Sequence, residues 1–495
     1  MLNTLSMLPV PFWLLLGVLG WGLAYGLREM STGIGLPIIV VLLTVAAWYV
    51  GDAFYNDYAA NHARLFSTEV LSAAWWQVLW FSAVFLAMAP VLHQWLNHRW
   101  LGRRCYSVHL YQAGVDDPAL QKQLGSLFRI CAWLWAGLLI SAWVRLRSEV
   151  VYYFFPFLSY RADPWARGRI GGGIDFLLVL GSYLDLLVAA CFGIVSSLST
   201  NRGVRFRALA GCAVTWPYIF LNGTRNYMLT AAVPGVLSWV LLKLRVKLPT
   251  KIALLAVSFL MISLWFSFVI ANRSVMSLVD AARQGSVLSE QAKAARHEGL
   301  NMLEELCWIN SFIDEGIYQP NRGERYFAEL VNPIPRTLWK KKPTIGLDYA
   351  VARGQGGRDI GQGDDAGVYA TISTGMIGQG VVNFGKWLGP AFAALLMALW
   401  AAVLARFDLR GDQFGRIPLF GVGLILTFNL GRDITLLTLY PFVFGTILVW
   451  LAQRVQLAPA PAEPPTEPPG RPELAWARGR RRRLRRGAGM LEKVE

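Results

Sequence analysis

The chain is poor in charged residues, cysteine and histidine. Only 16% of its 495 residues are Asp, Glu, Lys or Arg, whereas 55% are hydrophobic. This composition excludes an ordinary water-soluble globule and indicates a polytopic helical membrane protein. The five cysteines form no CxxC pair, and no His, Asp or Glu cluster has the spacing of metal ligands. We therefore expect no disulfide framework, no metal site and no cofactor.

The excess of positive charge does not indicate a nucleic-acid-binding protein. The net charge is +16, but many of the arginines stand in one run, 478–486, near the C-terminus. A proline-rich stretch precedes this run after Leu457 and predicts an extended linker. We expect a disordered cytoplasmic tail whose basic end lies on anionic lipid headgroups.

Apolar runs of about 20 residues, the length that crosses a bilayer, recur along the chain. They predict an all-α fold of about eleven membrane spans. The first run has no basic segment before it, so we expect a retained span and not a cleaved signal. The predicted spans are 8–27, 34–54, 71–92, 127–145, 174–198, 206–222, 226–243, 251–270, 387–405, 416–431 and 434–452.

The Lys/Arg bias of the short loops sets the predicted orientation. Basic loops alternate with others along the chain and agree with the basic tail, so they are assigned to the cytoplasm. The predicted division is spans 1–8 in 1–270, a long outer loop in 271–386, spans 9–11 in 387–452 and the tail in 453–495. One predicted outer loop, 145–173, breaks the rule because it is rich in arginine, including Arg161. Either a span is miscounted or this loop binds an anion.

The long outer loop has three parts. Segment 278–317 has helical apolar spacing, and 318–366 is rich in Gly and Pro and is interpreted as an ordered loop. Segment 368–384 is apolar but broken by glycines. We expect it to form a helix that dips to the membrane surface and continues into 387–405, with the glycines allowing close approach of backbones or a ligand.

Three arginines lie at breaks between apolar runs or in the long loop, all on the predicted outer face. They are Arg225, Arg336 and Arg432. Arginine grips phosphate oxygens with paired donors, so these three, with Arg161, are candidate ligands of a diphosphate. The alternative for each is a charge that caps a helix or reaches to the membrane surface.

Outer-face carboxylates are candidates for the base that a glycosyl transfer needs. We take Asp364, Asp365 and Asp433 as candidate catalytic residues, although a solvated or salt-bridged role is the common one for such residues. The adjacent Arg432 makes Asp433 a better structural partner than base. Other carboxylates and one histidine remain open: Asp52, Asp57, Glu324 and His297. The aromatic residues Tyr326, Trp339 and Tyr369 are candidates for holding a glycan.

Several motifs resemble those of the O-antigen polymerases, the Wzy-type oligosaccharide repeat-unit polymerases. The turn Gly223-Thr-Arg-Asn-Tyr-Met-Leu229 resembles the GSR/GTR turn of that family. The runs Gly323-Glu-Arg-Tyr326, 334–343 and 375–385 resemble its long-loop pattern, and Phe428-Asn-Leu-Gly-Arg-Asp433 its late arginine turn. The likeness covers about 205–435.

The resemblance implies a helical, GT-C-like glycosyltransferase in the bacterial inner membrane. Such an enzyme moves a growing glycan from undecaprenyl diphosphate onto a new lipid-linked repeat unit, on the periplasmic face, in lipopolysaccharide or related polysaccharide biosynthesis. Its partners would be the lipid-linked glycan, membrane lipid and a chain-length regulator. The matched residues here are Arg225, Arg336 and Arg432.

Two other functions remain open. An O-antigen ligase would use the same donor, but that family usually carries a His-containing motif in the long loop, where this chain has only His297. A transporter of lipid-linked oligosaccharide would favour inverted repeats, and the sequence shows none.

Overall fold

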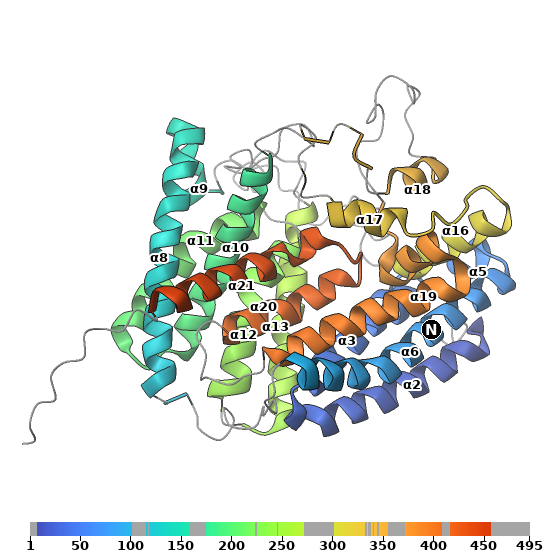
Figure 1. Ribbon diagram of the computed structural model, residues 1–495, viewed down its shortest axis with the longest axis horizontal. Helices are drawn as coiled ribbons and strands as arrows, with labels where there is room; N and C mark the ends of the chain where they lie inside the picture. The colour runs from blue at the N-terminus through green and yellow to red at the C-terminus, as the bar shows by residue number, and fades with distance from the viewer. Residues whose placement is uncertain are drawn as a thin grey trace, which may run out of the picture. The chain divides into compact units, whose positions relative to one another are not determined.

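The computed structural model is helical throughout its described residues, with no strand among them (Figure 1). These residues are 7–100, 115–116, 118–157, 175–222, 225–244, 246–271, 301–331, 334, 338–339, 341–343, 346–354, 372–407 and 416–456. Residues Met1–Val449 pack as one unit, and a second unit begins at Trp450. The predicted all-α fold class is confirmed.

Every predicted span coincides with a helix. The helices are α2 (Val10–Arg28), α3 (Gly35–Val45) with η2 (Ala46–Val50) and α4 (Gly51–Tyr55), α6 (Thr68–Trp100), α8 (Pro118–Leu146), α10 (Asp175–Leu198), α11 (Arg202–Asn222), α12 (Arg225–Ser238) with η4 (Trp239–Lys243), α13 (Leu248–Ala271), α19 (Gly375–Arg406), α20 (Arg416–Leu430) and α21 (Leu436–Gln456). Within the described ranges, six helical stretches are long and apolar enough to cross a membrane. A multi-pass membrane protein is therefore supported, and the larger number of spans remains a prediction.

The long loop contains helices that its composition concealed. Helix α16 (Met302–Asp314) confirms the last part of the predicted helix 278–317, whose earlier part lies outside the described residues. Segment 318–366, interpreted as an ordered loop, contains two helices, α17 (Glu324–Val331) and α18 (Leu347–Ala352). They are eight and six residues long, too short for an apolar pattern to mark them clearly in the sequence.

Helix α19 continues from the predicted loop segment 368–384 into the predicted span 387–405, as expected, but it bends sharply between them. Gly385 has a φ of 81°, a conformation that favours glycine, and divides α19 into two arms. The arms meet backbone to backbone, since a β-carbon on Gly380 would lie 2.2 Å from the Gly389 carbonyl oxygen. The first arm thereby occupies 375–384 of the predicted outer loop.

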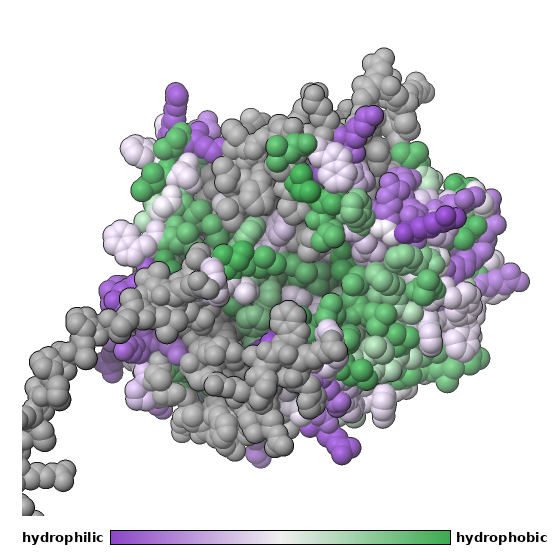
Figure 2. Space-filling model, in the orientation of Figure 1, coloured by the Kyte–Doolittle hydropathy of each residue, from purple (hydrophilic) through white to green (hydrophobic). Residues whose placement is uncertain are grey.

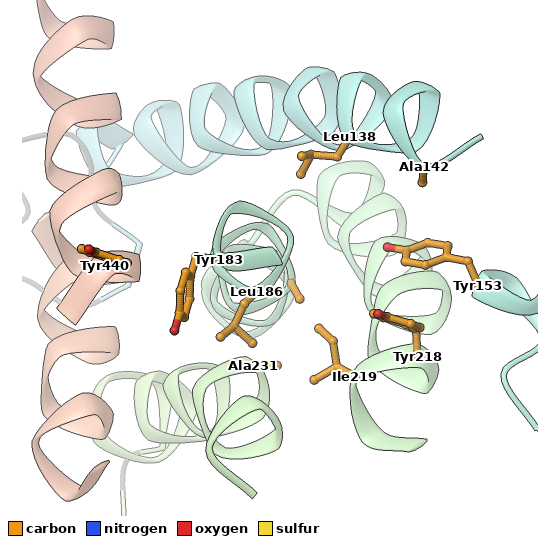
Figure 3. Close-up of a cluster of buried hydrophobic side chains, with 10 residues drawn as sticks. Leu138, Ala142, Tyr153, Tyr183, Leu186, Tyr218, Ile219, Ala231 and Tyr440 are labelled. Carbon is orange, nitrogen blue, oxygen red and sulfur yellow. The ribbon is translucent and has the colours of Figure 1, made fainter. Parts of the chain in front are cut away.

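Two helix pairs make the main packing contacts of the first unit. Helix α19 packs along α6, where Trp75, Phe81 and Phe85 are fully buried, and α10 packs against α12. Around α10, side chains from five further helices form a tyrosine-rich cluster (Figure 3). Tyr183 and Tyr440 face each other at 5.9 Å between ring centroids, and Tyr153 and Tyr218 at 4.8 Å. The Tyr153 hydroxyl donates a hydrogen bond to Asp185 at 2.9 Å, which satisfies part of a carboxylate buried among these helices.

We expect Gly380→Ala to destabilise the protein by about 1–3 kcal/mol, because the added methyl group has no space between the two arms of α19. The measurement is the thermal unfolding midpoint of the full-length protein in detergent. Gly137→Ala in α8 is the matched control, since a β-carbon there meets nothing within 4 Å. Equal midpoints for the two variants would contradict the close contact of the arms.

Candidate functional site

The turn between α20 and α21 is held from two sides. The Trp48 indole Nε1 donates to the Phe428 carbonyl at 2.8 Å, and the Met376 amide donates to the Gly431 carbonyl at 3.0 Å. Gly431 has no space for a side chain, because a β-carbon there would lie 2.3 Å from Trp48 Cδ1. The turn that carries Arg432 and Asp433 therefore has a fixed position against α3 and the start of α19.

Asp433 binds the start of α19. Its Oδ1 accepts hydrogen bonds from the Thr374 amide at 3.2 Å and the Thr374 hydroxyl at 3.1 Å, just before the helix begins at Gly375. A carboxylate at a helix N-terminus satisfies free N–H groups and is attracted by the helix dipole. Gln379 fixes the next residue, since its side-chain amide exchanges two hydrogen bonds with the Ile434 backbone at 2.7 and 3.1 Å.

Arg325 of α17 is the buried cation of this site. Its Nη2 lies 3.3 Å from Asp433 Oδ1 and donates to the Ile372 carbonyl at 3.4 Å. Its side chain is only 3% exposed, and its Nε and Nη1 have no hydrogen-bond partner. The guanidinium packs against Gly346, where a β-carbon would lie 3.2 Å from Cζ. Buried donors without partners are costly, so Arg325 keeps hydrogen-bonding capacity that no described residue uses.

Arg432 lies on the exposed side of the same segment. Its Nε donates to the Ser373 hydroxyl at 2.7 Å. The sequence placed Arg432 and Asp433 together because they are adjacent, but the ion-pair partner of Asp433 is Arg325, 108 residues away. Segment 372–374 thus brings two guanidinium groups to one place, one buried and one exposed.

Comparison with protein-family models, with curated proteins and with solved structures found no match to this chain. The described residues also contain no group of three or more His, Cys, Asp or Glu that could hold a metal ion. The site is therefore interpreted from its own geometry.

The two predicted glycan-binding aromatic residues in the described part of the loop, Tyr326 and Trp339, are both half-buried. Tyr326 packs its ring 6.2 Å from Phe384 and 5.4 Å from Phe392 of α19. Its buried hydroxyl has no partner, and burial raises the pKa of the phenol. Trp339 is half-buried and meets Phe327 edge to face at 6.3 Å.

Asp52, one of the open carboxylate candidates, has a structural role. It is fully buried, and its Oδ2 accepts hydrogen bonds from the Leu303 amide at 2.7 Å and the Glu304 amide at 3.1 Å. These amides belong to the start of α16, so a residue of the second predicted span caps a helix of the long loop. A carboxylate so enclosed is not available to a substrate.

A second buried carboxylate holds α16 to α18. Glu305 accepts hydrogen bonds from the Tyr349 hydroxyl and from Arg353 Nε, the latter at 3.3 Å. Arg353 also lies over the Trp308 ring, 4.4 Å from its centroid. Burial raises the pKa of Glu305, and the two hydrogen-bond donors oppose that shift.

Several predicted site residues lie outside the described residues. These are Arg161, Arg336, Asp364, Asp365 and Tyr369, and also the open candidate His297. Arg225 begins α12, but its side chain is outside the description. Their proposed roles remain predictions.

The sequence interpretation missed Arg325, although the residue stands inside the quoted motif Gly323–Tyr326. One signal was available: Arg325, Ala328 and Glu329 are three and four positions apart and share a face of α17. Because two of these three residues are charged, the sequence alone predicts that this face of α17 is exposed to water.

We expect the Arg325–Asp433 pair to be strongly coupled. Asp433→Asn should destabilise the protein by about 3–5 kcal/mol, because it leaves the buried charge of Arg325 unpaired, and Arg325→Leu should cost less, because Asp433 keeps its two hydrogen bonds from Thr374. The double variant should lose much less than the sum. A double-mutant cycle on unfolding midpoints in detergent measures this, and additive losses would contradict the coupling.

We expect Glu305→Gln to change how stability depends on pH. The folded-state pKa of Glu305 is raised, so its stabilising contribution is complete below the ordinary value of 4.5 and is lost as pH rises through the folded pKa. The glutamine variant stays neutral and should gain stability relative to the wild type from acid to neutral pH. The measurement is the unfolding midpoint of the wild type and of Glu305→Gln as a function of pH. If the two curves were parallel, the raised pKa of Glu305 would be contradicted.

Proposed function

We propose that the protein is a membrane glycosyltransferase that transfers a glycan from a lipid diphosphate to a sugar hydroxyl, as an oligosaccharide repeat-unit polymerase does. One observation supports the proposal: Arg325 is buried with two nitrogens, Nε and Nη1, that have no hydrogen-bond partner, and it contacts Ile372 while the exposed Arg432 contacts the next residue, Ser373. An anionic headgroup would satisfy the buried donors.

A diphosphate matches this pair of guanidinium groups in hydrogen-bonding capacity. Guanidinium groups bind phosphate oxygens through two parallel N–H···O bonds, and they remain charged at all working pH values. Arg325 has one Nη engaged by Asp433 and has Nε and Nη1 left for a ligand. Arg432 is tied to Ser373 through Nε alone. The predicted ligands Arg225 and Arg336 would add to this set.

The proposed reaction is a displacement at the anomeric carbon. The bond between that carbon and the diphosphate oxygen breaks, and a bond to the acceptor hydroxyl oxygen forms. The acceptor proton passes to a base, for which Asp364 and Asp365 remain the candidates, and the lipid diphosphate leaves. Arg325 and Arg432 would stabilise the negative charge that develops on the leaving group.

The fixed turn supports this role, because a preorganised cation stabilises charge without rearranging during the reaction. Asp433 is better suited to positioning than to catalysis. Its Oδ1 is already shared by Arg325 and Thr374, and protonating it would weaken the contacts that hold the site.

The proposal also includes the setting and partners that the sequence indicates. The donor would be an undecaprenyl-diphosphate-linked glycan, and the site would lie on the periplasmic side of the bacterial inner membrane. A chain-length regulator would be a candidate partner. These remain parts of the proposal.

We expect Arg432→Lys to remove most elongation of a synthetic lipid-diphosphate repeat unit in vitro, because lysine keeps the charge but loses the planar set of donors. Arg322→Lys is the matched control, since Arg322 is exposed in the same loop and contributes to none of the described contacts of the site. Gel separation of the lipid-linked products measures chain length, with EDTA added in a parallel reaction to check for a metal. Full-length ladders from Arg432→Lys would contradict the proposal.

A further inference from the structure

Helix α17 has two unlike faces. Its inner face binds the turn between α20 and α21 at two points one helical turn apart. Arg325 pairs with Asp433, and Glu329 accepts a hydrogen bond from the Thr435 hydroxyl at 2.6 Å. The helix is therefore fixed directly on the outer end of two predicted spans, with its opposite face turned away from the protein.

The opposite face of α17 is apolar and open. Phe327 and Leu330, three positions apart, are 49% and 65% exposed. The chain after α17 adds Ile334 and Leu338, the latter 80% exposed, and Trp339 lies edge to face against Phe327. Figure 2 shows apolar surface in the region of α17 with hydrophilic residues next to it. Exposed apolar side chains that gather in this way mark a surface that contacts something other than water.

The position of α17 places this face at the membrane boundary. Tyr326 contacts Phe384 and Phe392 on both sides of the bend in α19, where the second arm enters the membrane region. Next to the bend, Trp387 and Leu388 are themselves largely exposed, and the Trp80 indole donates to the Trp387 carbonyl at 3.2 Å. Exposed tryptophans at the ends of spans are typical of the interface between hydrocarbon and headgroups.

The charges around the apolar face are mainly positive. Lys341 is exposed beside Trp339, within the run Lys340–Lys342, and Arg322 is exposed just before α17. Glu324 is an exposed residue of opposite sign. An amphipathic helix with aromatic and aliphatic residues on one face and flanking lysines is suited to anionic lipid surfaces.

We propose that the apolar surface formed by Phe327 and Leu330 of α17 and by Leu338 and Trp339 after it docks into the lipid bilayer at headgroup depth, with Lys341 on anionic headgroups. Continuity with the exposed aromatic residues of the spans and the flanking positive charge favour lipid over a second protein. The inference does not depend on glycosyl transfer. It would place Arg325, on the inner face of the same helix, at the level where the phosphate groups of membrane lipids lie.

The test uses the full-length protein in nanodiscs, with an environment-sensitive fluorophore on a cysteine introduced at Leu330. Cys105→Ser provides the background, because the other four cysteines are buried. Ile140→Cys, exposed on the apolar helix α8, is the lipid reference, and Ile317→Cys, exposed after α16, is the aqueous reference. The quenchers are lipids with a nitroxide on the acyl chain and iodide in the buffer.

Docking predicts that the Leu330→Cys probe loses fluorescence to nitroxide lipid as the Ile140→Cys probe does and resists iodide. Quenching by iodide, as at Ile317→Cys, would overturn the proposal, and resistance to both quenchers would show a protein contact and overturn it equally. The role of Lys341 is tested by replacing phosphatidylglycerol with phosphatidylcholine. Nitroxide quenching of the Leu330→Cys probe should be weaker in phosphatidylcholine than in phosphatidylglycerol. In the Lys341→Gln variant, quenching should be the same in the two lipids. Equal quenching in both lipids would refute the contact with anionic headgroups.

Discussion

The contact between Asp433 and its three hydrogen-bond donors joins α17, the start of α19 and the turn between α20 and α21. One carboxylate oxygen accepts from Arg325 of α17 and from the amide and hydroxyl of Thr374 at the start of α19. The carboxylate itself belongs to the turn between α20 and α21. Helix α17, the start of the bent helix α19 and the turn between the predicted spans α20 and α21 are thus connected at a single atom. Because charge buried in this way is stable only when paired, the three segments depend on one another for their positions.

This connection also determines what the site can bind. Asp433 neutralises one part of the Arg325 guanidinium and leaves Nε and Nη1 without partners. The two unpartnered nitrogens give the site hydrogen-bonding capacity that an anion would use. Phosphate-bearing headgroups match this feature, and the apolar outer face of α17 suits the lipid to which such a headgroup is attached.

Much of the fold could be predicted from the sequence, because spanning a bilayer imposes a length and a composition that are visible without coordinates. The predicted apolar runs all fall on helices. The apolar residues and glycines of 368–384 also predicted correctly that this segment forms a helix continuous with 387–405. The site was less predictable. Adjacent residues suggested an Arg432–Asp433 pair, but Arg432 binds Ser373 and Asp433 binds Arg325. Asp52 looked like an available carboxylate and proved to be a helix cap. Long-range pairing of this kind leaves no periodicity in a single sequence.

The capping of α16 by Asp52 has a consequence for the independence of the long loop. The first amides of that helix depend on an acceptor located about 250 residues earlier, at the end of the helical stretch Gly35–Tyr55. Expressed as a fragment, the segment that contains α16, α17 and α18 would lack this acceptor and would also lack Asp433. It is therefore not an autonomous domain, and its architecture is completed only when the flanking membrane helices have assembled.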